Sequence, residues 1–324
     1  MYDIYFYEAF EEEEVSLRRY LPEGLRVGFT WKTIQESGDA LPPSRLISIR
    51  TQSILPLQWA EHLAGILSRS TGYDHILRYR QESGISVPAG HLPLYCNRSV
   101  AEQAMLLWMT LLRKLTRQLL QFKNFHRDGL TGFECKGKNL LVVGVGNIGS
   151  EIVKIGQGLE MAVKGVDLVE KHDFVDYTTI EEGIKQADII VCAMNLNETN
   201  YGYFSYDLLK KAPRGVLFVN IARGEMSPAE DLLRLMEEGH LGGLAMDVYN
   251  RETQLGVALR NNSRSDDPEV RATLALADRP NVLFTPHNAF NTHEAVERKS
   301  EQSIQQAVHF LREGKFLWEV PEQG

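Results

Sequence analysis

The sequence predicts an α/β protein in which a parallel sheet is covered by helices on both faces. From Lys138 onward, six short and almost wholly apolar runs recur at similar spacing, with helical segments between them. Strands that are buried on both faces are continuous apolar runs, whereas strands with one face in water alternate apolar and polar residues. A chain of 324 residues is also long enough for a second domain.

The six runs account for the second half of the chain in order. They span residues 139–146, 162–167, 187–194, 215–222, 242–249 and 281–286. Residues 253–272 are the least regular and predict a surface insertion with a short helix. In the first hundred residues, short apolar runs at 2–9, 25–30, 45–50 and 63–70 alternate with polar helical stretches. They predict a smaller α/β unit.

One long apolar helix is predicted between the two halves, over Ser99–Phe122. Ser99 is a candidate N-cap, with Glu102 three residues later as its capping-box partner. Apolar residues cover almost every face of this helix, so it is expected to be buried or to lie at a subunit interface. We expect a contribution to a homodimer, and the alternative is a helix held between two domains.

Composition and charge exclude several classes of function. The net charge is −8, and no dense run of Lys and Arg indicates a nucleic-acid or membrane surface. The acidic run Glu11–Glu14 is expected to be the solvated face of a helix. No apolar stretch reaches the ~20 residues that span a bilayer, and the N-terminus lacks a basic region. Cys96, Cys135 and Cys192 form no CxxC motif, which favours free thiols in a cytoplasmic protein and no metal site.

A glycine motif, "GVGNIG", follows the first of the six runs and opens a helix. Gly144, Gly146 and Gly149 suit a tight turn, close approach to a pyrophosphate and close packing of helix on strand. The next run ends at Asp167, 18 residues after Gly149, where a carboxylate can accept hydrogen bonds from the adenosine ribose. These features predict NAD as the cofactor. The alternative is a tight strand–helix turn beside a solvated aspartate.

Polar residues follow three of the later runs. Arg223 follows the fourth run, which ends near Asn220, and Asp247 and Glu252 lie at or after the end of the fifth. His287 follows the sixth. Carboxyl ends of parallel strands meet at one edge of a sheet, where ligands bind. Each residue taken alone is commonly structural, but together they predict a catalytic site.

The chemistry that suits these side chains is hydride transfer to a 2-keto acid. The developing alkoxide needs a proton donor, and histidine serves near neutral pH. A substrate carboxylate needs a fixed bidentate cation, for which Arg is better suited than Lys. A carboxylate behind the histidine favours its charged form and fixes its ring.

The ordered motifs resemble those of the D-isomer-specific 2-hydroxyacid dehydrogenases over nearly the whole chain. The resemblance rests on "GVGNIG" with Asp167, "VNIARGE", "AMDVYNRE" and "TPHNAFNTHEA", with "STGYDHI" and "YCNRSVAEQA" nearer the N-terminus. It implies two Rossmann-like domains, usually in a dimer. An inserted, doubly wound parallel-sheet NAD-binding domain spans residues 99–290, and a smaller, discontinuous substrate domain spans residues 1–98 and 291–324.

The resemblance also implies roles for single residues. Arg223, Glu252 and His287 would be catalytic, and Asp247 would hold the nicotinamide carboxamide. Asn147 and Ile148 would join the glycines in the cofactor site. The loop of Arg50, Thr51, Gln52 and Ser53 would lie against the substrate carboxylate through backbone and side-chain donors.

Within the family, the D-lactate dehydrogenases are the most similar branch. "YFYEAFEEE", "PLYCN" and "HNAF" resemble that branch, in which Tyr95 and Phe290 would line the substrate pocket. Two departures concern this pocket. Residues 193–195 are Ala-Met-Asn where the family usually carries His-x-Pro, and Asn291 stands where lactate enzymes commonly have an aromatic residue.

The predicted function is therefore NAD-dependent oxidation of a D-2-hydroxy acid or reduction of its 2-keto acid. Pyruvate and D-lactate are the leading pair. The alternatives are a glyoxylate or hydroxypyruvate reductase, a reductase of bulkier 2-keto acids, and an NAD-sensing binding protein without turnover. The intact set of Arg223, Glu252 and His287 argues against the last of these.

Overall fold

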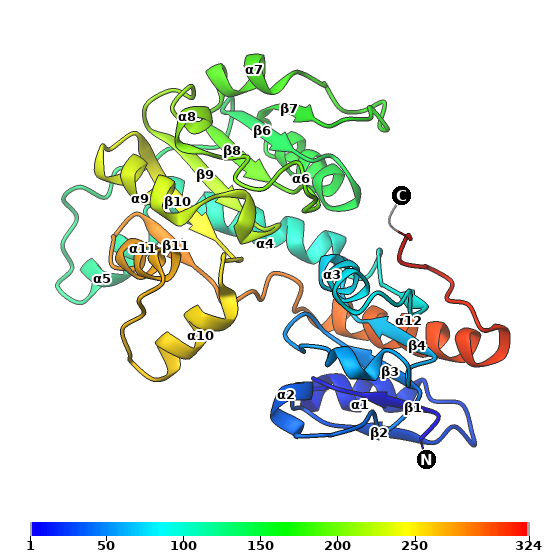
Figure 1. Ribbon diagram of the computed structural model, residues 1–324. Coiled ribbons are helices and arrows are strands. Elements are labelled where there is room, and N and C mark those ends of the chain that lie inside the picture. The colour runs from blue at the N-terminus through cyan, green and yellow to red at the C-terminus, as the bar shows by residue number, and fades with distance from the viewer. Residues whose placement is uncertain (1, 323–324) are drawn as a thin grey trace. The chain divides into compact units, whose positions relative to one another are not determined.

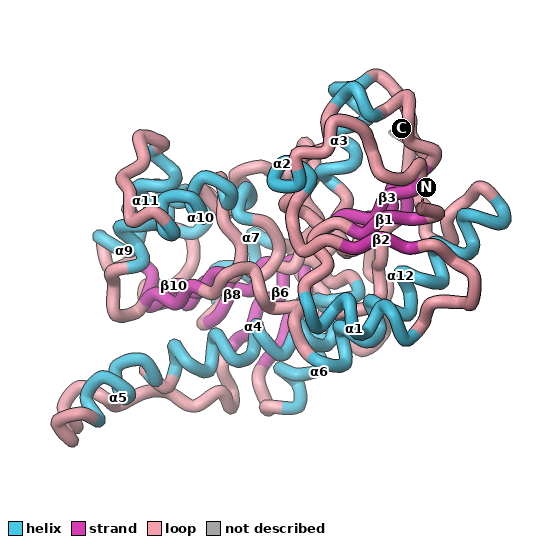
Figure 2. Tube along the Cα trace, turned by 90° about the horizontal axis from the view of Figure 1, so that it is seen from below, coloured by secondary structure: helices cyan, strands magenta, loops and turns pink. Residues whose placement is uncertain are grey.

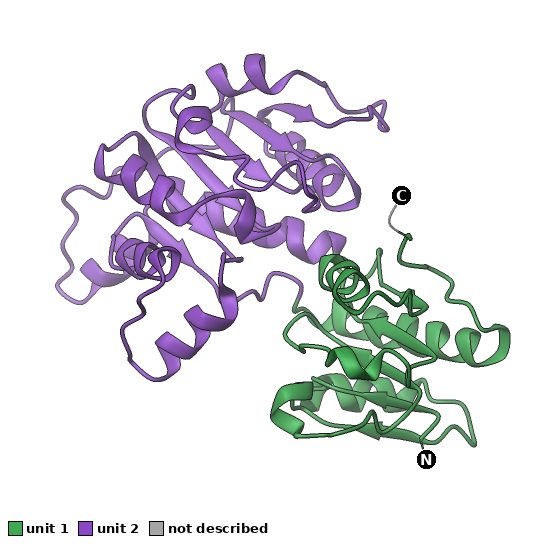
Figure 3. Ribbon diagram, in the orientation of Figure 1, with its two compact units in different colours: residues 1–96, 291–324 green, residues 97–290 purple. Residues whose placement is uncertain are grey.

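The computed structural model describes residues 2–322 and divides the chain into two compact units. Unit 1 comprises residues 1–96 and 291–324, and unit 2 comprises residues 97–290 (Figure 3). Each unit is built on a sheet of parallel strands with helices between them. The predicted α/β class with two parallel-sheet domains is confirmed.

Unit 1 has a parallel sheet with the strand order β2-β1-β3-β4-β5. Its strands are β1 (Ile4–Phe6), β2 (Val27–Phe29), β3 (Leu46–Ile49), β4 (Gly65–Ser68) and β5 (Ala89–Gly90). Its helices are α1 (Glu11–Arg19), α2 (Ile34–Ser37), α3 (Asp74–Ser83) and α12 (His293–Glu313), with a 3₁₀ turn, η1 (Leu57–Trp59). β1 to β4 lie within the four ranges predicted for strands.

The C-terminal helix α12 completes unit 1. The Thr292 side chain caps its N-terminus by accepting from the backbone N–H of Ala295 at 3.2 Å, and Gly314 ends it in the left-handed conformation. α12 packs against α1 and β4, so the last thirty-odd residues join a unit formed by the first ninety-six. Lys299 and Phe310 are among the α12 residues buried in this contact.

Unit 2, all of which the structure describes, has a parallel sheet with the order β11-β10-β9-β8-β6-β7. Its strands are β6 (Asn139–Val143), β7 (Ala162–Val166), β8 (Ile189–Cys192), β9 (Val216–Asn220), β10 (Leu241–Met246) and β11 (Val282–Phe284). Its helices are α4 (Asn97–Leu112), α5 (Leu115–Phe122), α6 (Asn147–Gly158), α7 (Ile180–Gly183), α8 (Tyr206–Leu209), α9 (Ala229–Glu237), α10 (Glu252–Arg260) and α11 (Pro268–Ala277). Two 3₁₀ turns, η2 (Ile184–Gln186) and η3 (Gly224–Met226), complete the unit.

The strand order of unit 2 reverses beside β6. β7 pairs with one edge of β6, and β8 with its other edge, after which the chain continues outward to β11 (Figure 1). A crevice forms at such a reversal, at the carboxyl ends of the strands, and receives ligands in open α/β sheets. The glycine motif follows β6, so it lies at this position.

The predicted helix Ser99–Phe122 is two helices in the structure. α4 begins at Asn97, so Ser99 lies inside the helix and is not its N-cap, and Lys114 adopts a left-handed conformation with φ 50° between α4 and α5. The carbonyl of Leu112 accepts the backbone N–H of Phe133 at 3.0 Å. Because the returning chain takes this carbonyl, the helix is interrupted there, which a local apolar pattern does not reveal.

The two helices have different surroundings. α4 packs on α6, β9 and β10 inside unit 2, whereas α5 has no buried residue and extends beyond the end of α4 (Figure 2). The irregular segment 253–272 also differs from the prediction of one short helix. It contains most of α10, the connection at 261–267 and the first half of α11, which is capped by Asp267 and begins with Pro268.

Candidate active site

The glycine motif and Asp167 meet at the carboxyl ends of β6 and β7. α6 begins at Asn147 directly after Gly146, and a Cβ built on Gly149 would lie 1.9 Å from the carbonyl oxygen of Gly144. Any side chain at Gly149 would therefore push the helix away from the turn. Asp167 accepts the backbone N–H of Val145 at 2.6 Å, so its carboxylate lies directly beside the turn.

This arrangement fits NAD. Asn147, Ile148 and Gly149 form the first turn of a twelve-residue helix, and the partial positive charge at a helix N-terminus favours a pyrophosphate. The second oxygen of Asp167 accepts the N–H of Val169 at 3.2 Å, which orients the carboxylate beyond the strand end. The residues present at the turn thus match those required by a dinucleotide.

Arg223 lies in a turn organised by a buried asparagine. The Asn220 side chain, fully buried at the end of β9, donates to the carbonyl of Arg223 at 2.9 Å and to Oγ of Ser227 at 2.8 Å. Its oxygen accepts the N–H of Ala222 at 3.0 Å. Arg223 itself is half-buried, and its Nη1 donates to the carbonyl of Ala222 at 2.8 Å. The guanidinium is therefore oriented by the chain segment that carries it.

The turn of Arg223 closely approaches the segment that leads to Glu252. A Cβ built on Gly224 would lie 2.0 Å from the carbonyl carbon of Tyr249 and 2.1 Å from the nitrogen of Asn250. Only glycine permits this contact between the chains that follow β9 and β10. The close approach sets the spacing between the arginine turn and the start of α10.

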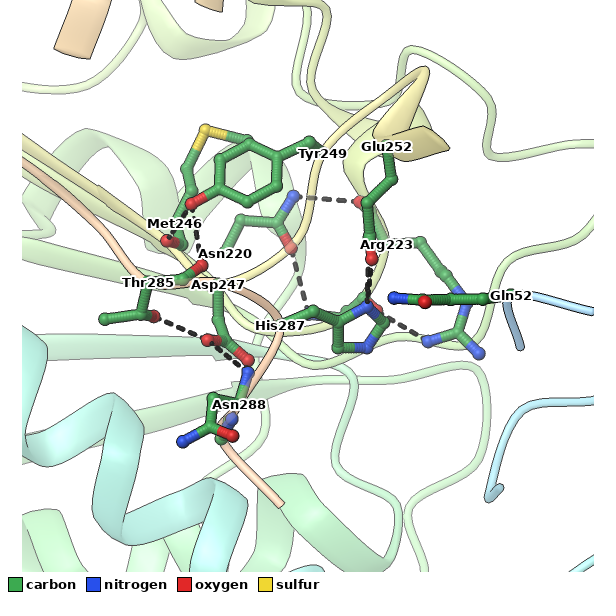
Figure 4. Close-up of polar contacts among 12 residues, drawn as sticks. Gln52, Asn220, Arg223, Met246, Asp247, Tyr249, Glu252, Thr285, His287 and Asn288 are labelled. Carbon is green, nitrogen blue, oxygen red and sulfur yellow. Dashed lines mark hydrogen bonds and ion pairs between the residues drawn. The ribbon is translucent and has the colours of Figure 1, made fainter. Parts of the chain in front are cut away.

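Asp247 secures the turn on which His287 lies. Its carboxylate, fully buried after β10, accepts the backbone N–H groups of Asn288 at 2.9 Å and Ala289 at 2.8 Å and the hydroxyl of Thr285 (Figure 4). Burial raises the pKa of Asp247, and these hydrogen bonds oppose the rise. His287 has a left-handed φ of 51°, which such anchoring on both sides can maintain.

Glu252 lies directly behind His287. Nδ1 of the imidazole is 3.0 Å from Oε1 and 2.9 Å from Oε2 of the carboxylate, with both side chains about one-quarter to one-third exposed (26% and 32%). An ionised carboxylate only accepts hydrogen bonds, so this contact places a hydrogen on Nδ1. Nε2 is the ring nitrogen left for a reacting group.

The three predicted catalytic side chains belong to neighbouring strands of one sheet. Arg223 follows β9, Glu252 begins α10 after β10, and His287 follows β11, and these strands pair in that order. Figure 4 draws them at the same edge. The arrangement combines a guanidinium, an imidazole and a carboxylate that orients it, as acid–base chemistry on a carboxylate substrate requires.

In unit 1 the loop Arg50–Ser53 is held by Glu8. The Glu8 carboxylate, which is 2% exposed, accepts the backbone N–H groups of Arg50 at 2.9 Å, Gln52 at 3.2 Å and Ser53 at 3.2 Å. Thr51 and Gln52 are exposed, whereas Ser53 is buried and accepts the N–H of Ile34. Because these three backbone donors serve Glu8, a ligand would meet the side chains of the loop.

The two residues predicted to line the substrate pocket belong to different units of the chain. Tyr95 is buried in unit 1, where its carbonyl accepts Nε of Arg298 at 2.8 Å. Phe290 is half-buried at the end of unit 2. Burial, first of all, raises the pKa of the Tyr95 hydroxyl well above its usual value.

Three residues that position the site were not assigned from the sequence. Thr285 donates to Asp247, the Tyr249 hydroxyl lies 2.7 Å from the carbonyl of Thr285, and Glu8 organises the loop of unit 1. Thr285 and Tyr249 lie inside the motifs "TPHNAF" and "AMDVYNRE", which could have indicated them. Glu8 lies inside the segment "YFYEAFEEE", which could likewise have indicated it.

Residues 2–322 contain neither a membrane-spanning helix nor a cluster of metal ligands. No helix in that range has both the length and the apolar character needed to cross a membrane. No group of three or more His, Cys, Asp or Glu side chains there is arranged to hold a metal ion.

Comparison with known proteins assigns the chain to a family. The model of the NAD-binding domain of D-isomer specific 2-hydroxyacid dehydrogenases matches residues 104–289, which is more than half of the chain. The chain belongs to this family. This dehydrogenase is therefore an NAD-dependent enzyme, and the matched residues lie wholly within unit 2.

Individual relatives agree with the assignment. The dehydrogenase is 30% identical over 256 residues to an aromatic 2-oxoacid reductase of Clostridium sporogenes, covering 77% of this chain and 76% of that protein. It is 31% identical over 250 residues to a D-lactate dehydrogenase of Escherichia coli, covering 74% of each. The structure of a D-lactate dehydrogenase from Aquifex aeolicus with NAD and lactic acid superposes with a TM-score of 0.86 and 26% identity, over 98% of this chain and all of that one.

Proposed function

We propose that this dehydrogenase reduces a small 2-oxo acid to the D-2-hydroxy acid, with pyruvate and D-lactate as the leading pair. The observation that carries the proposal is the contact of Glu252 with Nδ1 of His287 beside the turn of Arg223. This contact leaves Nε2 to exchange a proton with the substrate oxygen. Relatives named D-lactate dehydrogenase support the choice of pyruvate.

Each catalytic residue has a distinct role in the proposal. Bound NADH supplies the hydride. Arg223 holds the substrate carboxylate and polarises the 2-oxo oxygen, because its planar fork matches a carboxylate. His287 donates a proton from Nε2 to that oxygen during reduction and accepts one during oxidation. Glu252 keeps the imidazole in the required orientation through its contact with Nδ1.

We propose that the residues at the glycine turn, together with Asp167 and Asp247, bind NAD. Gly144, Gly146, Asn147, Ile148 and Gly149 receive the pyrophosphate, and Asp167 accepts hydrogen bonds from the adenosine ribose. Asp247 faces the nicotinamide carboxamide and also secures the turn of His287. The role of Asp247 in securing the His287 turn is supported by its hydrogen bonds to residues 285, 288 and 289.

We assign unit 1 as the substrate domain and unit 2 as the NAD-binding domain. Arg50, Thr51, Gln52 and Ser53 contact the substrate through side chains, since Glu8 uses three of the loop's backbone donors. Tyr95 and Phe290 line the pocket for the substrate side chain.

A panel of 2-oxo acids tests the function. NADH oxidation is followed with pyruvate, glyoxylate, hydroxypyruvate and phenylpyruvate, and the hydroxy acid product is resolved by chiral chromatography. We expect the highest kcat/KM with pyruvate and a hydroxy acid product of D configuration. Turnover of none of these acids, with NADH still bound, would identify a binding protein instead.

Bulky 2-oxo acids are a second candidate for the substrate. Large apolar side chains stand exposed after three neighbouring strands of unit 1: Phe10 after β1, Trp31 after β2 and Ile54 after β3. Such side chains suit an aromatic or branched substrate better than a methyl group. Relatives named aromatic 2-oxoacid reductase point the same way. A kcat/KM for phenylpyruvate at least tenfold above that for pyruvate would favour this candidate.

We propose a homodimer that uses α5. This helix buries none of its residues, and Leu119, Leu120 and Phe122 are each at least 60% exposed. Contiguous exposed apolar surface of this kind marks interaction sites. Sedimentation at micromolar concentration should show a species of twice 36.7 kDa. Leu119→Glu should shift it to the monomer and Leu311→Glu, an exposed leucine of unit 1, should not; a wild-type monomer would refute the dimer.

We further propose a cytoplasmic location. Cys96, Cys135 and Cys192 are free and buried in the structure, as reduced cysteines of a cytoplasmic enzyme commonly are. Fractionation of the source cells, with activity following the cytoplasmic marker, tests this location.

A further inference from the structure

The Arg50–Ser53 loop of unit 1 is held by a carboxylate from the neighbouring strand. Glu8 follows β1, which pairs with β3, and the loop follows β3. Oε2 of Glu8 accepts the backbone N–H groups of Arg50 at 2.9 Å and Ser53 at 3.2 Å. Oε1 accepts that of Gln52 at 3.2 Å. Three of the loop's four backbone donors thus end on one side chain, which is 2% exposed.

A glutamine that follows β2 also holds the loop. Gln35 lies in α2, and its Nε2 donates to the carbonyl of Gln52 at 2.9 Å. Its Oε1 accepts the backbone N–H of Ile54 at 3.0 Å. The Ser53 hydroxyl accepts the N–H of Ile34, the residue before Gln35, at 3.2 Å. The loop is therefore fixed by groups that follow both β1 and β2.

The backbone of Glu8 is itself tightly constrained. Its φ is 53°, a left-handed value that residues other than glycine seldom adopt. Its N–H donates to the carbonyl of Lys32 at 3.0 Å, and the N–H of Ala9 donates to the carbonyl of Thr30 at 2.9 Å. Strained residues persist where the surrounding structure over-determines them, and they concentrate at functional sites. A glycine would adopt this backbone without strain, but it would not supply the carboxylate that the loop requires.

The loop exposes two side chains, those of Thr51 and Gln52. In the proposed function these side chains contact the substrate. A loop that is disordered when free must be ordered as its ligand binds, and this ordering lowers the affinity. A loop that its neighbours already fix avoids most of this loss. The contacts made by Glu8 and Gln35 therefore bear on the affinity for the substrate.

We propose that Glu8 and Gln35 are positioning residues that preorganise the Arg50–Ser53 loop for binding of the 2-oxo acid. The inference rests on the proposed function, in which this loop contacts the substrate. Neither residue touches the reacting atoms. The loop serves the bound substrate and the transition state alike, so its loss of order raises KM and leaves kcat nearly unchanged.

The first test replaces Gln35, which is exposed and whose removal the fold should tolerate. Gln35→Ala removes two hydrogen bonds to the loop, each of which changes the equilibrium of loop opening roughly two- to tenfold. The KM for pyruvate should rise on the order of tenfold, with kcat and the Kd of NADH within about twofold. Gln81→Ala, which removes an exposed glutamine of α3, is the matched control and should behave as the wild type.

Glu8→Gln separates the hydrogen bonds of Glu8 from its charge. The amide keeps one acceptor oxygen and turns a donor towards the loop, so at least one of the three contacts is lost. A positioning role predicts that the KM for pyruvate rises on the order of tenfold. If the charge of Glu8 acted instead, by repelling the substrate carboxylate, the KM would fall. A fall in KM would therefore overturn the inference.

Two measurements do not depend on turnover. Oxamate, an unreactive carboxylate analogue of pyruvate, is titrated into the NADH-loaded enzyme, and its Kd should rise in parallel with KM in both variants. Trypsin, which cleaves after arginine, reports on the loop through the bond between Arg50 and Thr51. Cleavage at this bond, identified by mass spectrometry, should be on the order of tenfold faster in Gln35→Ala than in the wild type. Cleavage after Arg264, an exposed residue of unit 2, should keep its rate.

The outcomes separate this inference from the proposed function. An unchanged KM and oxamate Kd in Gln35→Ala would overturn the inference, even if trypsin cleaved the loop faster. If Glu8→Gln does not fold, Gln35→Ala decides. A wild type that reduces no 2-oxo acid would overturn the proposed function. The oxamate Kd would then still decide the inference: a higher value in Gln35→Ala supports it, and equal values overturn it.

Discussion

The carboxylate of Glu252 contacts Nδ1 of His287 through both of its oxygens, at 3.0 and 2.9 Å. The two residues are 35 positions apart in sequence and follow adjacent parallel strands. The contact fixes the ring so that Nε2 is the nitrogen available for proton exchange. It therefore defines which atom of the protein is expected to act as the acid and base.

His287→Ala should lower kcat by roughly 10²–10⁴-fold, because the proton donor is lost. NADH binding, measured by fluorescence, should be nearly unchanged. His293→Ala is the control, since His293 begins α12 and is exposed. If His293→Ala were inactive and His287→Ala active, His287 would not be the catalytic acid and base.

Arg223→Lys keeps the charge but loses the planar fork that matches a carboxylate. We expect a large rise in KM for the 2-oxo acid and a fall in kcat, with the Kd of NADH nearly constant. Arg214→Lys, an exposed arginine of the same unit, should behave as the wild type. If Arg223→Lys retained near-normal kcat/KM, the role of Arg223 would be structural.

Asp167 should determine the preference for NADH over NADPH. A 2′-phosphate would bring negative charge against a carboxylate that already lies beside the glycine turn, 2.6 Å from the nitrogen of Val145. Asp167→Ala should weaken NADH binding and narrow the ratio of kcat/KM between NADH and NADPH. Equal efficiency of the wild type with both cofactors would contradict this expectation.

Asp247→Asn should impair the His287 turn, because an amide presents only one acceptor oxygen to the donors at residues 285, 288 and 289. Leaving a buried donor unsatisfied costs about 1–3 kcal/mol. We expect a lower melting temperature and a fall in kcat on the order of tenfold or more. A change in NADH affinity alone would instead assign Asp247 to the cofactor.

Lys299 should make stability increase with pH in the alkaline range. Its pKa is about 8 in the folded protein and 10.5 when exposed, so the unfolded state binds more protons between these values. The free energy of unfolding should therefore rise with pH across this window, by at most about 3 kcal/mol relative to Lys299→Met. Urea denaturation at pH 7.5 and 10.5 measures the difference. If the free energy of unfolding changed equally with pH in both proteins, the pKa of Lys299 would not be lowered by folding.

Much of the fold could be predicted because it depends on neighbouring residues. The six apolar runs became β6 to β11, since continuous apolar residues are stable only as strands or helices buried on all sides. The glycine motif was recognisable because its three glycines are required within one turn. His287 was recognisable because Pro286 ends a short apolar run just before it.

The sequence by itself thus determined the strands, the glycine turn and the residues at the strand ends, all of which depend on patterns a few residues long. Only the tertiary structure decided where α4 ends, because the carbonyl of Leu112 is taken by Phe133, twenty-one residues later. The same holds for the contacts of Glu13 with Arg69 and Lys299, because the three residues lie far apart in the sequence. A buried charge is tolerated only through partners in three dimensions, and no local pattern records those partners.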